Sequence, residues 1–425
     1  MIPRKISLYW ASISLDITIH VLFRWILVFW QNPAVLREKL VYQISKSYCE
    51  GDWYMFGSAR SGLSLFLKTL VNEGDEVIIS SYTCLAVPSA VIAADAVPVY
   101  IDIEPNTLSI NEAQLWSAVN KKTKAIVIQH TLGNPASILK ISRKANSLGL
   151  LVIEDCALSL GTLIEGRNVG TFGDASIFSM ELSKTLSCGW GGLLLVNNTD
   201  LVPKISRSYI SVPEQPILKS TCDLLQTIIS TWCTHPKFFE FPGKYIMQLC
   251  WKIKLFRPST PKEEFMGVTA KDSLHKMGKA QTLLATLQWR KSQTVTATCA
   301  KNYAMLVKNL RSLGYATHAS QNKKIKGVAN RVSFLANNRT EMMDFFRNKH
   351  IELGLWFDGP LSPVPIKKIF NYKAGTFPVA ESIAEQVVNI PCHNRLSGDD
   401  IEIILSCLKE YTKLYNDSNN IKAVS

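Results

Sequence analysis

The hydrophobic and polar positions of the chain change their pattern at residue 51. From there, short runs of apolar or β-branched residues alternate with stretches in which apolar residues recur at helical spacing. This alternation is typical of a mostly parallel sheet with helices on both faces, and ligands bind to such sheets at the carboxyl ends of the strands. The runs predict strands at 76–80, 97–101, 124–129, 150–154, 175–179 and 192–196, and the helical spacing predicts helices at 85–94, 111–119 and 138–148.

Further along the chain, the segment 202–271 breaks the alternation with proline-containing turns and clusters of aromatic and basic residues, and we interpret it as a partly helical insertion. A long helical stretch from about residue 282 then leads into a second α/β pattern, with strands at 332–335 and 388–390 and helices at 340–349 and 399–414. We therefore expect an N-terminal amphipathic helical segment (1–50), a large domain (51–281) that carries the insertion, and a smaller C-terminal domain (282–425).

The N-terminal run 6–30 is apolar, but Asp16, His20 and Arg24 interrupt it at every fourth position and share one helix face. A membrane-spanning helix needs about 20 nearly uninterrupted apolar residues, and the run lacks the cleavage site of a signal peptide. We expect an amphipathic helix that packs on the body or on a partner subunit, or that lies on an anionic membrane. The aromatic and basic stretch 236–257 has a similar composition, so the two segments either pack together or share a lipid-facing surface.

Charge and cysteine content narrow the class of protein. The 425 residues include 47 Lys and Arg against 34 Asp and Glu, a formal net charge of +13 that favours an anionic partner. The basic residues are dispersed and no nucleic-acid-reading motif is present, which argues against nucleic acid. The ten cysteines form no CxxC pair, which argues against a zinc ribbon or a thioredoxin-like motif. We predict a cytoplasmic protein without a metal site.

Residues with chemical potential follow several of the predicted strands. Asp155 comes directly after the strand 150–154, where its carboxylate either pairs with a cationic ligand atom or caps a helix. Lys184 follows the strand 175–179, and a lysine near a buried acid can have a lowered pKa and act as a nucleophilic amine.

Two glycine-containing turns accompany these residues. The turn GSARSG at 57–62 runs into a helical stretch, and the free N–H groups at such a helix start bind anions. The turn at 189–192 allows close approach of the backbone to the same pocket. An acid, a lysine and an anion-binding helix start are the groups needed to hold pyridoxal 5′-phosphate.

Several motifs in order along the chain carry a family resemblance. They cover most of residues 51–200 and 330–412 and resemble the DegT/DnrJ/StrS family of pyridoxal-phosphate-dependent sugar aminotransferases. The resemblance implies an α/β protein of fold type I, with a large cofactor-binding domain whose mainly parallel sheet lies between helices and a smaller C-terminal α/β domain. The motifs include GSARSGL, GDEVIISSYTCLAVPSAV, GLLVIEDCALSLG, GRNVGTFGDASIFSMELSKTLSCGWGGLLLVNN and FPVAESIAEQVVNIPCHNRLSGDDIEII.

Residue by residue, the resemblance implies roles in binding the cofactor. Lys184 would bind it covalently and shuttle the proton, and Asp155 would partner its ring nitrogen. Ser179 and the backbone amides of Ala59 and Arg60 would hold its phosphate.

The chain also departs from the family pattern in three places. Cys84 stands where an aromatic residue often stacks on the cofactor ring, although Tyr82 is two residues away. Leu158 stands in place of a glutamine, and the insertion 202–271 occupies the place of a loop thought to reach the neighbouring subunit's cofactor.

The resemblance implies an aminotransferase that moves an amino group from glutamate or glutamine to a keto sugar, expected to be nucleotide-linked, in polysaccharide or antibiotic sugar biosynthesis. It also implies a homodimer. A sister branch dehydrates sugars with His in place of the lysine, and Lys184 argues against that branch. The departures motivate an alternative, a non-catalytic protein that binds the cofactor and serves as a regulatory or membrane-peripheral component of a polysaccharide pathway.

Overall fold

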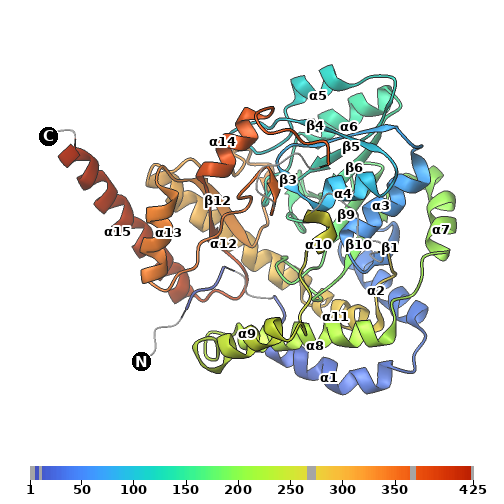
Figure 1. Ribbon diagram of the computed structural model, residues 1–425, viewed down its shortest axis with the longest axis horizontal. Helices are drawn as coiled ribbons and strands as arrows, with labels where there is room; N and C mark the ends of the chain where they lie inside the picture. The colour runs from blue at the N-terminus through green and yellow to red at the C-terminus, as the bar shows by residue number, and fades with distance from the viewer. Residues whose placement is uncertain (1–4, 9–11, 266–273, 364–369, 423–425) are drawn as a thin grey trace.

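The computed structural model describes residues 5–8, 12–265, 274–363 and 370–422 (Figure 1). A seven-stranded sheet forms its centre, with the strand order β1-β10-β9-β6-β5-β2-β4. The strands from β9 to β4 pair in parallel, whereas β10 is antiparallel to both of its neighbours. The strands are β1 (Asp52–Phe56), β2 (Glu76–Ser80), β4 (Val97–Ile101), β5 (Thr123–Gln129), β6 (Leu151–Asp155), β9 (Ala175–Ser179) and β10 (Gly192–Val196).

The six strands predicted from the pattern are confirmed, and the expectation of an α/β fold is confirmed with them. They are recognisable as apolar runs because helices cover both faces of the sheet and leave no solvated side. In β2, Val77 and Ile79 belong to the buried cluster on one face and Ile78 to the cluster on the other. The edge strand β1 was not predicted.

Helices form a layer on each face of this sheet (Figure 1). The helices α3, α4 and α7 pack with one buried cluster, and α2, α5, α6 and α11 pack with the other. The predicted helices at 85–94, 111–119 and 138–148 correspond to α4, α5 and α6. The bounds are α2 (Pro33–Ser47), α3 (Ala59–Leu70), α4 (Ala86–Ile92), α5 (Glu112–Ala118), α6 (Ile138–Ser147), η1 (Thr199–Leu201), α7 (Val202–Ile210) and α11 (Lys279–Trp289).

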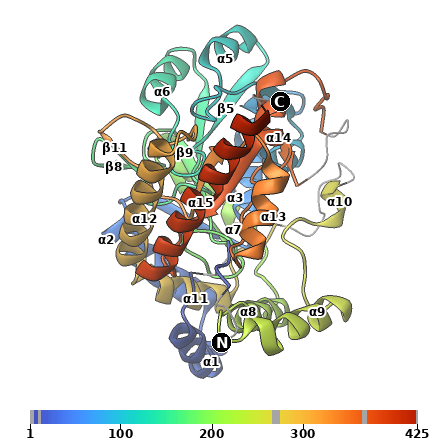
Figure 2. The same cartoon turned by 90° about the vertical axis from the view of Figure 1, so that its left-hand side faces the viewer.

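A third buried cluster is built largely by the C-terminal part of the chain, whose helices α12 to α15 are labelled in Figure 2 and whose strands β12 and β14 pair antiparallel. The predicted strands and helices of this part are present, and α14 is an addition that the pattern did not predict. The proposed division into domains stays a prediction. The elements are α12 (Ser292–Ser312), β12 (Arg331–Leu335), α13 (Arg339–Asn348), α14 (Pro378–Gln386), β14 (Val387–Pro391) and α15 (Gly398–Lys422).

Short strands connect distant parts of the chain. β3 (Thr83–Cys84) pairs in parallel with β13 (Leu361–Ser362), which fastens the C-terminal part to the loop after β2. A small sheet of β11 (Ile325–Lys326), β7 (Leu163–Ile164) and β8 (Arg167–Asn168) makes a second connection.

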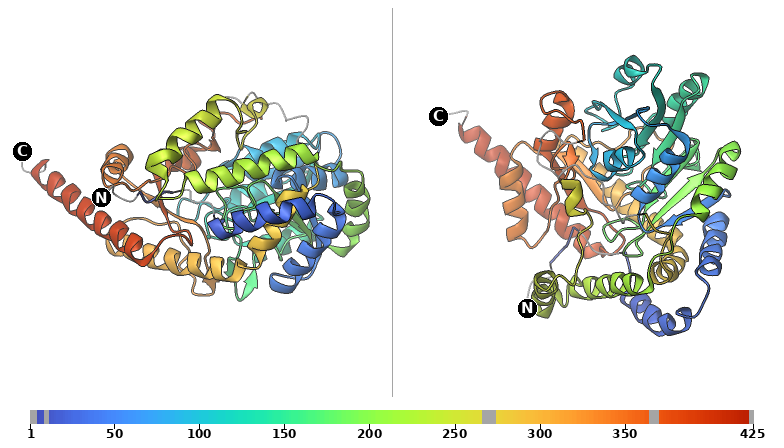
Figure 3. Two further views of the ribbon diagram at one scale, coloured as in Figure 1. Left: turned by 90° about the horizontal axis from the view of Figure 1, so that it is seen from below. Right: turned by 45° about the vertical axis from the view of Figure 1, so that its right-hand side comes forward.

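The insertion is helical, as predicted, and lies beside the N-terminal helix (Figure 3). α1 packs against α8 and α11, and the Trp232 Nε1–H donates a hydrogen bond of 2.9 Å to Thr18 Oγ1. In the described part of the chain, no helix combines the length and hydropathy needed to cross a membrane. These helices are α1 (Leu15–Val28), α8 (Ile217–Cys233), the π-helical turn η2 (Phe239–Gly243), α9 (Lys244–Lys252) and α10 (Lys262–Phe265).

Candidate active site

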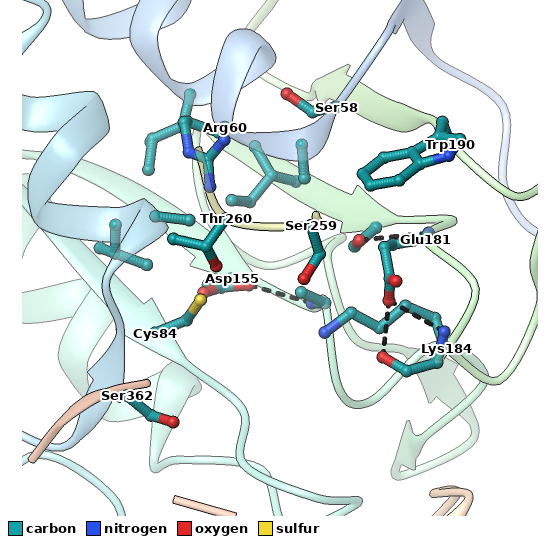
Figure 4. Close-up of a pocket in the computed structure, with 18 of the residues that line it drawn as sticks. Ser58, Arg60, Cys84, Asp155, Glu181, Lys184, Trp190, Ser259, Thr260 and Ser362 are labelled. Carbon is teal, nitrogen blue, oxygen red and sulfur yellow. Dashed lines mark hydrogen bonds between the residues drawn. The ribbon is translucent and has the colours of Figure 1, made fainter. Parts of the chain in front are cut away.

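A cavity of about 320 Å³ lies where β6 and β9 end (Figure 4). Its wall contains every residue that the sequence analysis assigned to cofactor binding or catalysis. These residues are Ala59, Arg60, Cys84, Asp155, Ser179 and Lys184.

Asp155 is the last residue of β6, a central strand whose neighbours are β5 and β9. Its Oδ1 accepts a 3.0 Å hydrogen bond from the Ala157 N–H, and a turn rather than a helix follows, so the helix-cap interpretation is wrong. Burial raises the pKa of Asp155, against the opposing effect of that hydrogen bond and of the Lys184 and His130 charges. Within the described residues, its Oδ2 has no hydrogen-bond partner.

Lys184 lies in the loop after β9, and its amine enters the same cavity (Figure 4). Burial lowers the pKa of Lys184, while the nearby Glu181 carboxylate raises it and the Arg331 guanidinium lowers it further. The Lys184 Nζ lies 4.6 Å from the centre of the Trp356 ring, and none of the described residues forms a hydrogen bond with it. The site therefore holds an amine that loses its proton more easily than an exposed lysine does.

The start of α3 forms another part of the cavity wall. Ser58 caps the helix by accepting a hydrogen bond from the Ser61 N–H, at 3.2 Å, which leaves the N–H groups of Ala59 and Arg60 without a partner inside the helix. Gly192 of β10 packs against this helix start, because a Cβ built on it would lie 2.0 Å from Ala59 N. The close backbone approach predicted for the glycine-rich turn is thus directed at the anion-binding end of α3.

The Arg60 side chain is engaged with another residue. Its Nε lies 2.8 Å from Oε1 of Glu264, which is completely buried and also accepts a hydrogen bond from Ser89 Oγ at 2.7 Å. Burial raises the pKa of Glu264, and the Arg60 charge lowers it. The positive charge of Arg60 is therefore partly neutralised, which leaves the backbone N–H groups as the better anion donors.

Ser179 and Cys84 complete the predicted set. Ser179 ends β9, and its Oγ accepts a hydrogen bond of 3.4 Å from the Glu181 N–H. Cys84 lies in β3, and burial raises the pKa of its thiol. Tyr82 does not supply the missing aromatic surface, because its buried hydroxyl is hydrogen-bonded to the backbone of Phe357.

Leu158, in place of the family glutamine, belongs to an apolar cluster and is not part of the cavity wall.

The sequence analysis missed residues from distant parts of the chain that line the cavity or lie behind its wall. Trp356 stands next to Lys184, and the buried Arg331 lies 4.0 Å from the same ring and donates a hydrogen bond of 3.1 Å to the Ser183 carbonyl. Glu181 accepts hydrogen bonds from the backbone and hydroxyl of Ser183. Trp356 lies in a segment without a periodic pattern, and no local signal would have identified it. Trp190, Ser259, Thr260 and Phe357 also line the cavity.

A cluster of three buried residues outside the cavity wall contains the residue types of a metal site. The ligand atoms of His130, Glu154 and Cys156 lie within 4.8 Å of one another. However, both Glu154 oxygens accept backbone N–H hydrogen bonds, from Gly170 at 2.8 Å and from Phe172 at 2.6 Å, and His130 Nε2 lies 2.9 Å from Glu154 Oε2. These contacts occupy the carboxylate and give the group a structural role.

The features of the cavity fit pyridoxal 5′-phosphate. The chain offers a buried amine of lowered pKa, a carboxylate with one unpartnered oxygen, and a helix start with free N–H groups. The residues present therefore match the groups of the cofactor.

Comparison with known proteins agrees with this arrangement. A model of the DegT/DnrJ/EryC1/StrS aminotransferase family matches residues 54–211 and 260–409. The unmatched residues 212–259 lie inside the predicted insertion and include α8 and α9.

Individual relatives extend the comparison. An uncharacterized protein, MJ1066, of Methanocaldococcus jannaschii is 27% identical over 358 residues, 83% of this chain and 84% of the relative. A UDP-N-acetyl-3-dehydro-alpha-D-glucosamine 3-aminotransferase of Acidithiobacillus ferrooxidans is 37% identical over 150 residues, 35% of this chain and 41% of the relative. The solved structure of the putative sugar aminotransferase Spr1654 from Streptococcus pneumoniae shares the fold, with a TM-score of 0.74, 16% identity and 99% of each chain covered.

Proposed function

The chain belongs to the DegT/DnrJ/EryC1/StrS aminotransferase family, whose members depend on pyridoxal 5′-phosphate, and we propose that it transfers an amino group from glutamate or glutamine to a nucleotide-linked keto sugar. The observation that carries this proposal is the meeting of Lys184, Asp155 and the start of α3 in one buried cavity. The relatives favour an enzyme over the non-catalytic alternative.

Each group of the cofactor has a counterpart in the cavity. Lys184 would hold the cofactor covalently, Asp155 would face the ring nitrogen, and Ser179 with the amides of Ala59 and Arg60 would bind the phosphate. When bound, the cofactor supplies an electron sink for the pair of electrons that remains when a proton leaves Cα of the amino donor.

The two ionisable residues are prepared for complementary tasks. Burial lowers the pKa of Lys184, which favours the neutral amine that can accept a proton from Cα and return it. Burial raises the pKa of Asp155, so its negative charge is costly until a cationic partner is present. A protonated ring nitrogen is such a partner, and the pairing would keep that nitrogen protonated.

The substrate class follows from the family and from charge. One relative is named for a UDP-linked keto sugar, and the formal net charge of +13 suits an anionic nucleotide. The Trp356 ring in the cavity wall, with the buried Arg331 lying against it, would contact whatever lies beside the Lys184 amine. The homodimer, the cytoplasmic location and the polysaccharide or antibiotic-sugar pathway stay predictions.

The test is a spectrum of the purified protein loaded with the cofactor. We expect the visible band of the lysine-bound cofactor to fade with glutamate or glutamine and to return when a nucleotide-linked keto sugar is added, with the amino sugar identified by mass spectrometry. Lys184→Ala should lack the band and the turnover, while Lys68→Ala, which removes an exposed lysine of α3, should retain both. Full turnover of Lys184→Ala would refute the assignment, and a band that no amino donor changes would favour the non-catalytic alternative.

A further inference from the structure

The helices α1, α8 and α9 lie together on one side of the molecule, away from α5 and α6 (Figures 1 to 3). α1 precedes the part of the chain that the family model matches, and α8 and α9 lie in its gap. These additions carry many of the exposed large apolar side chains. We define the apolar platform as Phe23, Ile26, Leu27 and Trp30 of the N-terminal segment together with Phe241, Tyr245, Leu249, Trp251 and Ile253 of the insertion.

α1 is apolar on two opposite faces. Ile17, Val21 and Val28 are buried and attach the helix to the body. Phe23, Ile26 and Leu27 lie at helical spacing on the other side, and Trp30 follows in the turn after the helix; Phe23 is 75% and Trp30 84% exposed. A helix on the water-exposed surface of a protein normally carries polar residues on its outer face. The outer face of α1 is instead apolar, so it is suited to an apolar environment.

The insertion is held to the body through α8 rather than through the platform residues. Buried Leu224 and Ile228 belong to the same core cluster as residues of α11. Ser220 Oγ donates a hydrogen bond of 2.7 Å to Gln281 Oε1.

The segment after α9 is in turn tied to α8 by polar contacts. Arg257 Nε lies 2.6 Å from Oδ1 of buried Asp223, and the Gln226 side-chain amide donates to the Arg257 carbonyl at 3.0 Å. Cys250 is the buried residue of α9, whose remaining apolar side chains face outward or lie partly exposed. The platform is therefore anchored without using the apolar surface that it displays.

The charges around the platform are mostly positive. Residues 217–257 contain six Lys and Arg and two acidic residues, and both acids are paired, Asp223 with Arg257 and Glu240 with Lys244. Within the described residues, Lys237, Lys252 and Lys254 form no ion pair. These lysines are interleaved with the aromatic and aliphatic side chains of the platform.

We propose that the apolar platform docks on an anionic lipid bilayer. Lysine is depleted from the cores of protein interfaces, whereas lysines mixed with exposed Trp, Tyr and Phe suit a layer of anionic headgroups above acyl chains. The chain passes from Lys254 in this region to Ser259 and Thr260, which line the cavity. The docking proposal does not rest on the proposed aminotransferase function.

The test is sedimentation of the full-length protein with vesicles of phosphatidylcholine alone or mixed with phosphatidylglycerol, at low and physiological salt. We expect binding to the mixed vesicles that weakens with salt. Phe23→Ser with Trp30→Ser should lower the partition coefficient by at least about tenfold. Lys252→Gln with Lys254→Gln should lower it about 25-fold, because each charge near an anionic surface contributes about fivefold.

A matched control removes an exposed apolar residue elsewhere. Leu148, 50% exposed just after α6, lies far from the platform helices, and Leu148→Ser should bind vesicles like the wild type. Circular dichroism and the mass of each protein in solution without lipid complete the comparison. The proposal is overturned if the wild type does not sediment with mixed vesicles, or if both platform variants bind as the wild type does. It is also overturned if the Phe23 and Trp30 changes dissociate an oligomer, because the platform would then be an interface between copies.

Discussion

The substitution Gly192→Ala tests whether the start of α3 binds the cofactor phosphate. Gly192 pairs with Phe56 and with Ser179 in the sheet, so its backbone is fixed from both sides. An added Cβ would lie 2.0 Å from Ala59 N and 2.2 Å from Ser58 C, whereas real Cβ contacts are essentially never shorter than 3.0 Å. The atoms it meets are backbone, so the helix start has to retreat by about 1 Å.

The size of the effect follows from this displacement. A shift of about 1 Å would lengthen an ordinary N–H···O contact beyond hydrogen-bonding distance. Hydrogen bonds to a charged group contribute about 1.5–3 kcal/mol each, so losing both amide contacts should weaken phosphate binding by roughly 10²- to 10⁴-fold. Overpacking should also lower the free energy of unfolding by about 1–3 kcal/mol.

The assay compares two ligands. Pyridoxal 5′-phosphate and pyridoxal, which lacks the phosphate, are titrated into the cofactor-free protein and followed by absorbance. We expect Gly192→Ala to lose affinity mainly for the phosphorylated ligand. Gly398→Ala, at the start of α15 and outside the cavity wall, adds a Cβ that meets no atom within 4 Å and should resemble the wild type in affinity and stability. An equal loss for both ligands, or wild-type affinity with unchanged stability, would refute the reasoning.

Three further predictions concern ionisable groups. Asp155→Asn should keep the cofactor but slow the half-reaction with the amino donor by about 10²-fold or more, because the neutral amide no longer stabilises a protonated ring nitrogen. Stopped-flow rates within a few-fold of the wild type would remove Asp155 from this role. Glu181→Gln removes a charge that raises the pKa of Lys184, so cofactor capture measured against pH should begin at a lower pH than in the wild type. A shift to higher pH would contradict the assigned contact. Burial lowers the pKa of His318 and of His393 from 6.5 to about 4, so the unfolded chain binds protons in this range that the folded chain does not. The free energy of unfolding should therefore fall as pH falls from 6.5 to about 4, by up to about 3 kcal/mol for each histidine, and denaturant titrations at several pH values that show no such decline would be inconsistent with neutral buried rings.

Much of the central sheet was predictable because its signal is local. The strands β2, β4, β9 and β10 have the predicted bounds, since helices bury both of their faces and their residues form continuous apolar runs. Asp155 and Lys184 could be identified for a related reason. Asp155 ends β6 and Lys184 lies in the loop after β9, and the carboxyl ends of strands in a parallel sheet, with the loops that follow them, form the edge where ligands bind.

Features that depend on edges or on single side chains were harder to predict. The edge strand β1 has an exposed first residue, Asp52, and gains its partner β10 from about 140 residues later. Asp155 offers its carboxylate to an N–H two residues ahead, and the local sequence is equally compatible with that turn and with a helix cap. Local chemistry leaves such alternatives open until neighbouring elements are placed.

The sequence by itself determined the α/β architecture and the positions of the lysine and the acid near strand ends, because periodicity and strand ends are properties of consecutive residues. Only the tertiary structure decided that Trp356 stands against Lys184 with Arg331 against the same ring, that Glu264 partly neutralises Arg60, and that α1 lies beside the insertion. These contacts join residues far apart along the chain. Which side chains meet, and so which charges are paired and which amine loses its proton easily, depends on how the elements pack in three dimensions.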